Sequence, residues 1–326
     1  MVLAKVLAFA EPLAVTCHHR ADVSGARQGG ARARMGHMGY RLQKSASLDE
    51  NLRRIAVERI DASLAGLAAG ADDAAALHEL RKNIKHLRAL LRLYGAAADP
   101  RRRHDRHLRD AGRAIGTLRE SDALLALFDE LAATPSLTGP AAADVRAGLV
   151  AAMTPVRTDR AAALAAHETM LLALRKDVAG WHPGARGFAD LDSGLRAAWR
   201  AARRLMKPAL RRPAGKALHE WRKRVKDHGY HARLLQPIWP AMMDPHIETV
   251  SRLGDLLGEA RDCALLGERL KSIRGGKPFA RRARKRHAAT LAEAAGLARR
   301  LLAEKPSNLA PRWQSWWSLW QESRKD

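Results

Sequence analysis

One helical segment occurs twice in this sequence, and that repeat limits what the chain can fold into. Residues 77–93, LHELRKNIKHLRALLRL, place leucine or isoleucine at alternating steps of three and four, which is the spacing of one buried helix face. Residues 218–235, LHEWRKRVKDHGYHARLL, repeat the pattern 141 positions later. The chain is therefore predicted to contain a duplicated helical unit. The matched polar pairs are His78 with His219, Arg81 with Arg222, Lys82 with Lys223, and Lys85 with Lys226.

Cations form a second stripe beside the apolar one on the first of these helices. The stripe keeps the same three-four spacing, and Lys82 flanks it. A helix that needed only solubility would mix both charge signs on its outer face. We therefore interpret the stripe as part of a binding surface; the alternative is the solvated flank of an amphipathic helix. Its members are His78, Arg81, Lys85, Arg88 and Arg92.

A second, shorter repeat sets the size of the duplicated unit. Ile115–Arg119, IGTLR, is matched by Leu257–Arg261, LGEAR. An aspartate follows each arginine, Asp122 in the first copy and Asp262 in the second. We interpret each arginine with its aspartate as a structural ion pair that sets helix geometry. The two repeats together define a unit of about 140 residues.

The predicted fold is all-α, with one helical bundle in each half of the chain. Alanine, leucine and arginine are abundant while aromatic residues make up only 5%, and this composition favours helices over strands. Proline and glycine in residues 181–187 break every helical period. We therefore expect one domain at residues 47–324, with halves 47–181 and 188–324. Residues 1–46, rich in Gly, Arg, Ser and His in their second part, are predicted to be a disordered arm.

The beginning of the chain supports two further expectations. Residues 2–15 are mildly apolar, but Glu11 interrupts them, so we do not expect an export signal. Met35 and Met38 directly precede the organised sequence. We hypothesise that translation begins at one of them, which would leave residues 1–34 or residues 1–37 untranslated, and N-terminal sequencing of the native protein tests this.

The charge balance indicates an anionic partner. Lys and Arg number 58 against 34 Asp and Glu, a formal net charge of +24, and such an excess repels itself unless a polyanion or an acidic surface neutralises it. Cys17 and Cys263 are the only cysteines, which excludes a disulfide framework or a cysteine-rich zinc site and favours the cytoplasm. No stretch approaches the ~18 uncharged residues of a membrane span. We expect neither a cofactor nor a metal.

Further cations at helical spacing extend the candidate surface beyond the repeated segment. The third predicted helix, the helix that opens the second half and the last long helix each carry a basic run. The candidate residues in these runs are Arg109, Arg113, Arg200, Arg203, Lys207, Arg282 and Lys285.

The duplicated HxxRKxxxK helix resembles the CHAD family, the conserved histidine α-helical domain. The paired Gly-xx-Arg turn, the lead-in Gly39–Leu42 and the closing Glu304–Pro306 agree with it, so the resemblance covers about residues 39–320. It implies two helical bundles related by a pseudo-twofold axis and the binding of inorganic polyphosphate, in many bacteria on polyphosphate granules. The positions that it implies for binding are His78, Arg81, Lys82, Lys85, His219, Arg222, Lys223 and Lys226, with Arg88 continuing the first group.

Enzymatic activity is not expected. CHAD units are often fused to a triphosphate tunnel metalloenzyme domain with an ExExK signature, which this chain lacks. It also lacks a Walker-type glycine loop and an HExxH motif. A polyphosphate kinase or phosphatase would need metal-holding carboxylates or a phosphorylatable histidine in a pocket. The chain is therefore predicted to capture a polyanion without transforming it.

Several alternatives remain open from the sequence. A basic nucleic-acid-binding protein fits the charge equally well, although no recognisable DNA-binding motif is present. A scaffold that docks other proteins to granules through its tryptophan-bearing C-terminus is a third reading. Trp313, Trp316, Trp317 and Trp320 are expected to pack in the core in preference to stacking on bases. The repeated histidines either contact phosphate or are structural near-core residues.

Overall fold

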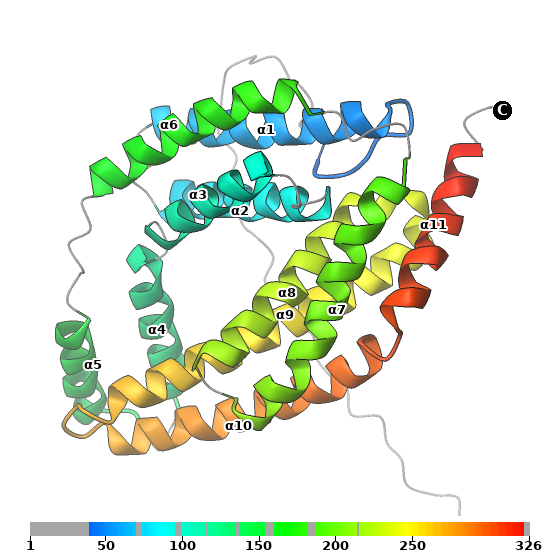
Figure 1. The fold of residues 1–326 in the computed structure, drawn as a ribbon. Coiled ribbons are helices and arrows are strands. Elements are labelled where there is room, and N and C mark those ends of the chain that lie inside the picture. Colours follow the sequence, from blue (N-terminus) through cyan, green and yellow to red (C-terminus); the bar gives the residue numbers. More distant parts are fainter. Residues whose placement is uncertain are drawn as a thin grey trace, which may run out of the picture. The chain divides into compact units, whose positions relative to one another are not determined.

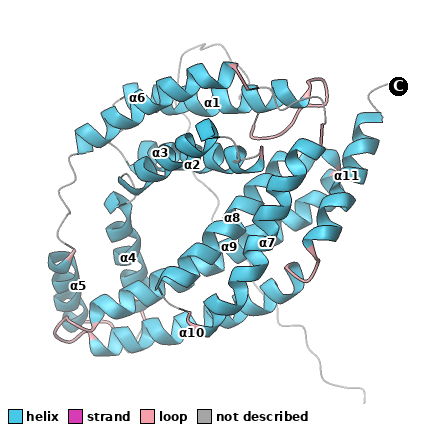
Figure 2. Cartoon of the chain, viewed as in Figure 1, coloured by secondary structure: helices cyan, strands magenta, loops and turns pink. Residues whose placement is uncertain are grey.

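The computed structural model describes residues 39–69, 74–94, 99–114, 117–134, 137–153, 160–181, 187–213 and 215–322. Within these ranges the regular elements are eleven α-helices and one 3-10 helix (Figure 1), and Figure 2 shows no strand among the described residues. The all-α prediction is confirmed.

The helices follow one another with short connections. Ser47 begins the first of them with a capping box, because its hydroxyl accepts from Glu50 N at 3.2 Å and its own N–H donates to the Glu50 carboxylate at 2.7 Å. The elements are α1 (Leu48–Ala68), α2 (Ala74–Leu93), α3 (Asp99–Ala114), α4 (Thr117–Ala132), α5 (Pro140–Ala152), α6 (Arg160–Ala179), α7 (Ala189–Arg211), α8 (Gly215–Leu234), η1 (Gln236–Ile238), α9 (Pro240–Leu270), α10 (Lys277–Leu301) and α11 (Pro306–Glu322).

The larger hydrophobic core joins the two repeated segments. Helix α1 packs on α2 and α6, and α3 packs on α2 and α6; in the second half α8 lies between α7 and α9, and α11 covers α7. Helix α2 also contacts α7 and α8. Gly194 on α7 allows this approach, because a Cβ there would overlap the carbonyl oxygens of Arg92 and Leu93 at the end of α2.

A second core is built from both halves of the sequence. Helices α4 and α5 pack chiefly against α9 and α10, so the two predicted bundles are interleaved in this region. The Phe128 ring lies 5.0 Å from the Phe279 ring, centroid to centroid, and Leu149 and Cys263 are fully buried beside them. The pseudo-twofold relation between the halves stays a prediction.

The predicted boundary of the arm lies several residues too late. Tyr40 and Leu42 are buried, with the Tyr40 hydroxyl donating to His86 O at 3.1 Å and Leu42 N donating to Leu234 O at 3.0 Å. Two apolar side chains and two hydrogen bonds offset the entropy cost of ordering this short segment. Residues 1–38 of the predicted arm, and the hypothesis on their translation, lie outside the described residues.

The C-terminal tryptophans belong mainly to the core, as predicted. Trp313 and Trp317 are buried, while Trp316 and Trp320 are half-buried and pack against the same cluster. Trp313 also packs against the rings of His228 and His246. None of the described helices is long and apolar enough to cross a membrane.

Candidate anion-binding site

The two repeated helices are in direct contact through their second halves. The His231 imidazole on α8 lies 3.0 Å from the Ala89 carbonyl oxygen on α2, through its Nε2 atom. One turn further along α2, the Arg92 guanidinium reaches Asp227 on α8 at 2.6 Å. In each helix these contacts lie C-terminal to the repeated motif residues. The two copies of the motif are therefore attached to one rigid junction.

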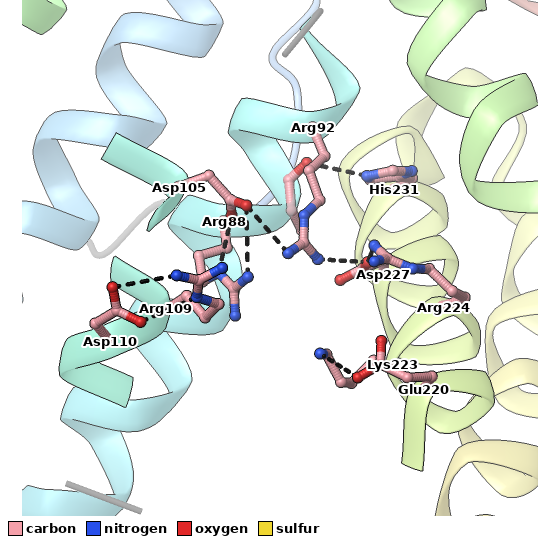
Figure 3. A network of polar contacts seen from close by, with 11 residues as sticks. Arg88, Arg92, Asp105, Arg109, Asp110, Glu220, Lys223, Arg224, Asp227 and His231 are labelled. Atoms are coloured by element: carbon pink, nitrogen blue, oxygen red, sulfur yellow. Dashed lines mark hydrogen bonds and ion pairs between the residues drawn. The ribbon is translucent and has the colours of Figure 1, made fainter. Parts of the chain in front are cut away.

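A half-buried ion network holds that junction together (Figure 3). Arg92 bridges Asp227 and Asp105, the latter at 3.3 Å on α3. Arg88 holds the other oxygen of Asp105 at 2.8 Å, and Arg224 holds Asp227 at 2.9 Å. Burial alone would lower the pKa of Arg92, but the two carboxylates raise it above its ordinary value. The network fixes the register of α2, α3 and α8.

Arg88 and Arg92 make structural contacts within this network. Their side chains are only 15% and 16% exposed, and each guanidinium is bound to at least one carboxylate. Burial alone would raise the pKa of Asp105, but the hydrogen bond from Arg88 and the charge of Arg92 lower it. The sequence did not reveal this role, because the acids that pair with these arginines are far away in the chain. Phosphate binding by Arg88 stays a prediction that competes with this contact.

The second copy of the motif lies against α9. Arg222 Nε donates to the Gly254 carbonyl oxygen at 3.3 Å, and the Lys226 ammonium lies 2.8 Å from the Asp255 carboxylate. Burial lowers the pKa of Arg222 from its ordinary value, and Asp262 opposes that effect. Lys223 is paired with Glu220 at 2.9 Å on its own helix.

Cations from two helices converge on His219. Burial is the first cause of its lowered pKa, and the positive charges of Arg261, Lys223 and Arg222 add to the lowering. Arg261 comes from α9 and is paired with Asp262 at 2.9 Å, which confirms the predicted ion pair in this copy. The corresponding side chains of Arg119 and Asp122 lie outside the described residues. His219 Nδ1 is buried and has no hydrogen-bond partner in the described part of the chain.

The first copy of the motif is more exposed. His78 and Lys85 are exposed, Arg81 is half-buried, and Lys82 pairs with Glu79 at 3.1 Å. Cations also affect the neighbouring His86. Burial is the first cause that lowers the pKa of His86 to about 3, and cations on three helices lower it further. The contributing cations are Arg59 on α1, Lys82 and Lys85 on α2, and Arg233 on α8.

Sequence reasoning missed Arg59, Arg233 and Arg261 as parts of this charged region. Arg59 and Arg233 lie outside the repeated motif, and only the fold brings them close to His86. Arg261 was recognised only as half of an ion pair, although its repeated position was a usable signal. Arg233 and Arg261 belong to the candidate surface, whereas the Arg59 side chain is only 14% exposed and lies 3.8 Å from the Glu58 carboxylate.

The predicted cations of α3 and α7 have mixed surroundings. Arg109 pairs with Asp110 at 3.0 Å, and Arg113 is 71% exposed and lies 3.7 Å from the same carboxylate. Arg200 and Lys207 are exposed on α7. Arg203 instead donates to the carbonyl oxygens of Ala303, at 3.0 Å, and Glu304, after the end of α10. Arg203 therefore holds the turn that follows α10.

The predicted cations of α10 are exposed. Arg282 and Lys285 both face solvent. Their neighbour Arg286 is bound to Glu259 at 2.6 Å and to Glu130 at 2.7 Å, and it connects α10 with α9 and α4.

Among the described residues, no group of three or more His, Cys, Asp or Glu side chains could hold a metal ion.

The fold is all-helical, and its two contacting basic helices carry the same motif. These features define a class of duplicated α-helical proteins with a cationic surface. The family model described as CHAD domain matches residues 51–271, well over half of the chain and both copies of the motif. The chain belongs to the CHAD family, as its sequence motifs predicted. No curated protein matches it.

Proposed function

We propose that this protein binds inorganic polyphosphate on the cationic surface around α2 and α8. The observation that carries the proposal is the placement of the second motif against α9, where Arg222 Nε lies 3.3 Å from the Gly254 carbonyl oxygen, Lys226 Nζ lies 2.8 Å from Asp255, and the same helix carries Arg261. Cations held this close repel one another, and a bound polyanion relieves the repulsion. Membership of the CHAD family supports the same ligand.

The chemistry of the ligand fits the spacing of the cations. Polyphosphate is a flexible thread with about one charge per phosphate and no bases to read. Cations three or four residues apart on a helix lie about 5–6 Å from one another, within reach of neighbouring or next-neighbouring phosphates. An arginine grips two phosphate oxygens and a lysine provides a mobile point charge. The affinity is expected to fall steeply with salt and to rise with polymer length.

A salt-controlled competition tests the proposal. Binding of long polyphosphate, short polyphosphate and duplex DNA is compared for the wild type and for a variant with Arg81, Lys85, Arg222 and Lys226 changed to Ala. We expect long polyphosphate to bind tightest and the variant to lose most of that binding. Equal affinity for DNA and long polyphosphate would favour the nucleic-acid alternative.

A matched control separates the site from net charge. Four exposed cations outside the candidate surface are changed to Ala, so that both variants lose four positive charges: Arg274, Lys277, Arg299 and Arg300. We expect this control to bind polyphosphate almost as well as the wild type. Equal loss in the two variants would show that binding is a diffuse charge effect and that the site is assigned wrongly.

We also propose that the protein acts by binding alone, in the cytoplasm and on polyphosphate granules. Incubation with polyphosphate and Mg²⁺ or Mn²⁺ should leave the chain-length distribution unchanged on a gel, and shortening would reveal an enzyme. A fluorescent fusion should form foci only in cells that make polyphosphate. Foci that persist without polyphosphate would favour the protein-docking alternative.

A further inference from the structure

Two glycines on α9 lie directly beneath the cations of the second motif. Gly254 and Gly258 are one helical turn apart, and a Cβ at Gly254 would lie 2.8 Å from Lys226 Cε. A Cβ at Gly258 would lie 3.0 Å from Arg222 Nε and 3.1 Å from its Nη2. These separations are shorter than van der Waals contact. The Lys226 and Arg222 side chains therefore rest on bare helix backbone at these two positions.

The surroundings distinguish these glycines from glycines that serve helix packing. At Gly194 an added Cβ would meet the backbone of α2, and at Gly229 it would lie 3.1 Å from the Val250 side chain. At Gly254 and Gly258 the three nearest atoms all belong to one cationic side chain. At these two positions the glycine therefore makes room for a cationic side chain of α8 and not for the α8 backbone.

We propose that Gly254 and Gly258 are positioning residues for anion binding, and this inference rests on the proposed function. They form a flat strip on α9 across which Arg222 and Lys226 extend. The Gly254 carbonyl oxygen fixes Arg222 Nε at 3.3 Å. The terminal Nη atoms then remain to grip two phosphate oxygens, and Asp255 orients the Lys226 ammonium at 2.8 Å. Side chains held in this way lose less conformational freedom on binding than free ones.

The strip also gives a physical reason for one repeated sequence feature. Gly258 is the glycine of the repeated segment Leu257–Arg261, so the glycine and the arginine of that segment both serve the surface around His219. In the first half the position corresponding to Gly254 is Gly112, where a Cβ would meet the Ile84 side chain at 3.4 Å and no cation. The counterpart of Gly258 is Gly116, which lies outside the described residues, so the inference concerns the second copy alone.

The test replaces one hydrogen atom by a methyl group. Gly258→Ala should lift the guanidinium from α9 and leave the fold intact, because only the end of a flexible side chain has to move and alanine favours helix more than glycine does. We expect the melting temperature to be no lower than that of the wild type, polyphosphate affinity to fall about tenfold, and its log-log salt slope to become shallower by about one. Gly254→Ala should act similarly through Lys226.

Matched controls are present in the same chain. Gly66 on α1 and Gly296 on α10 have open space where a Cβ would be added, so Gly66→Ala and Gly296→Ala should leave the affinity unchanged. The double variant Gly258→Ala with Arg222→Ala should bind no more weakly than Arg222→Ala alone. Unchanged affinity in Gly258→Ala, or additive losses in the double variant, would overturn the inference.

A measurement without ligand separates this inference from the proposed function. The Nε–Hε NMR signal of Arg222, assigned with Arg222→Lys, should be shifted and protected from exchange in the wild type and Gly296→Ala, and should become solvent-like in Gly258→Ala. If the wild type fails to bind polyphosphate but the signal behaves in this way, the ligand is wrong and the positioning stands. If the signal does not change in Gly258→Ala, the positioning is wrong whatever the ligand.

Discussion

Arg92→Met is expected to weaken the fold and to spare the binding surface, although Arg92 belongs to the same cationic stripe as Arg81 and Lys85. The Arg92 guanidinium contacts Asp227 at 2.6 Å and Asp105 at 3.3 Å, with the arginine 16% exposed and Asp227 10% exposed. Breaking a fully buried ion pair costs about 3–5 kcal/mol because a charge is left uncompensated. Methionine keeps most of the apolar volume of the arginine stem.

The two carboxylates that lose Arg92 each have a second arginine partner, which limits the loss of stability. Asp105 keeps Arg88 at 2.8 Å and Asp227 keeps Arg224 at 2.9 Å, so neither becomes unpaired. The side chains are also partly exposed, and exposed pairs are worth less. We therefore expect Arg92→Met to lower the free energy of unfolding by about 2–3 kcal/mol, less than the value for a fully buried pair.

Urea unfolding followed by circular dichroism measures the change, and polyphosphate binding is measured on the same samples. Arg222→Met is the matched variant from the other repeated helix, because Arg222 has a backbone carbonyl as its hydrogen-bond partner and is bound to no carboxylate among the described residues. We expect Arg92→Met to lose stability with binding nearly intact, and Arg222→Met to lose binding with stability nearly intact. The reverse pattern would refute the division of the stripe into structural and binding residues.

Three further predictions follow from burial. Burial lowers the pKa of His167, His231 and His246 from 6.5 to about 4, so on acidification the unfolded chain takes up protons before the folded one. Each of these histidines should therefore lower the free energy of unfolding by about 2 kcal/mol between pH 7 and pH 5. A urea midpoint that stays constant over this range would contradict the prediction. Gly194→Ala should prevent folding, seen as insoluble expression, because backbone oxygens block the methyl group. Burial raises the pKa of Cys263 to about 11, so a thiol reagent should label it only after unfolding.

The sequence predicted the positions of the helices better than the contacts between them. The three-four spacing of α2 correctly placed Leu80, Ile84 and Leu87 in the core, because that periodicity depends only on local helix geometry. The same spacing placed Arg88 and Arg92 in one stripe with exposed Lys85. It gave no sign that Asp105 on α3 would pair with both arginines or that Asp227 on α8 would pair with Arg92, since such pairings are set by tertiary contacts.

The sequence could indicate members of the candidate site only where they lie in the repeated motif, and their binding role stays a prediction. Duplication indicated His219, Arg222 and Lys226, and the structure places Arg222 and His219 among further cations. The approach of Arg59 and Arg233 to His86 depends on how α1 and α8 pack. The packing of α4 and α5 against α9 and α10 likewise depends on tertiary contacts, and no local pattern in the sequence specifies it.

The shared core of α4, α5, α9 and α10 has a consequence for synthesis of the chain on the ribosome. Phe128 emerges about 150 residues before Phe279, its ring partner. At 5–20 residues per second, the α4–α5 hairpin would present its apolar face for roughly 7–30 s before the covering helices exist. A nascent chain stalled in that interval should be a good substrate for chaperones that bind exposed hydrophobic segments, and release of the complete chain should end that affinity.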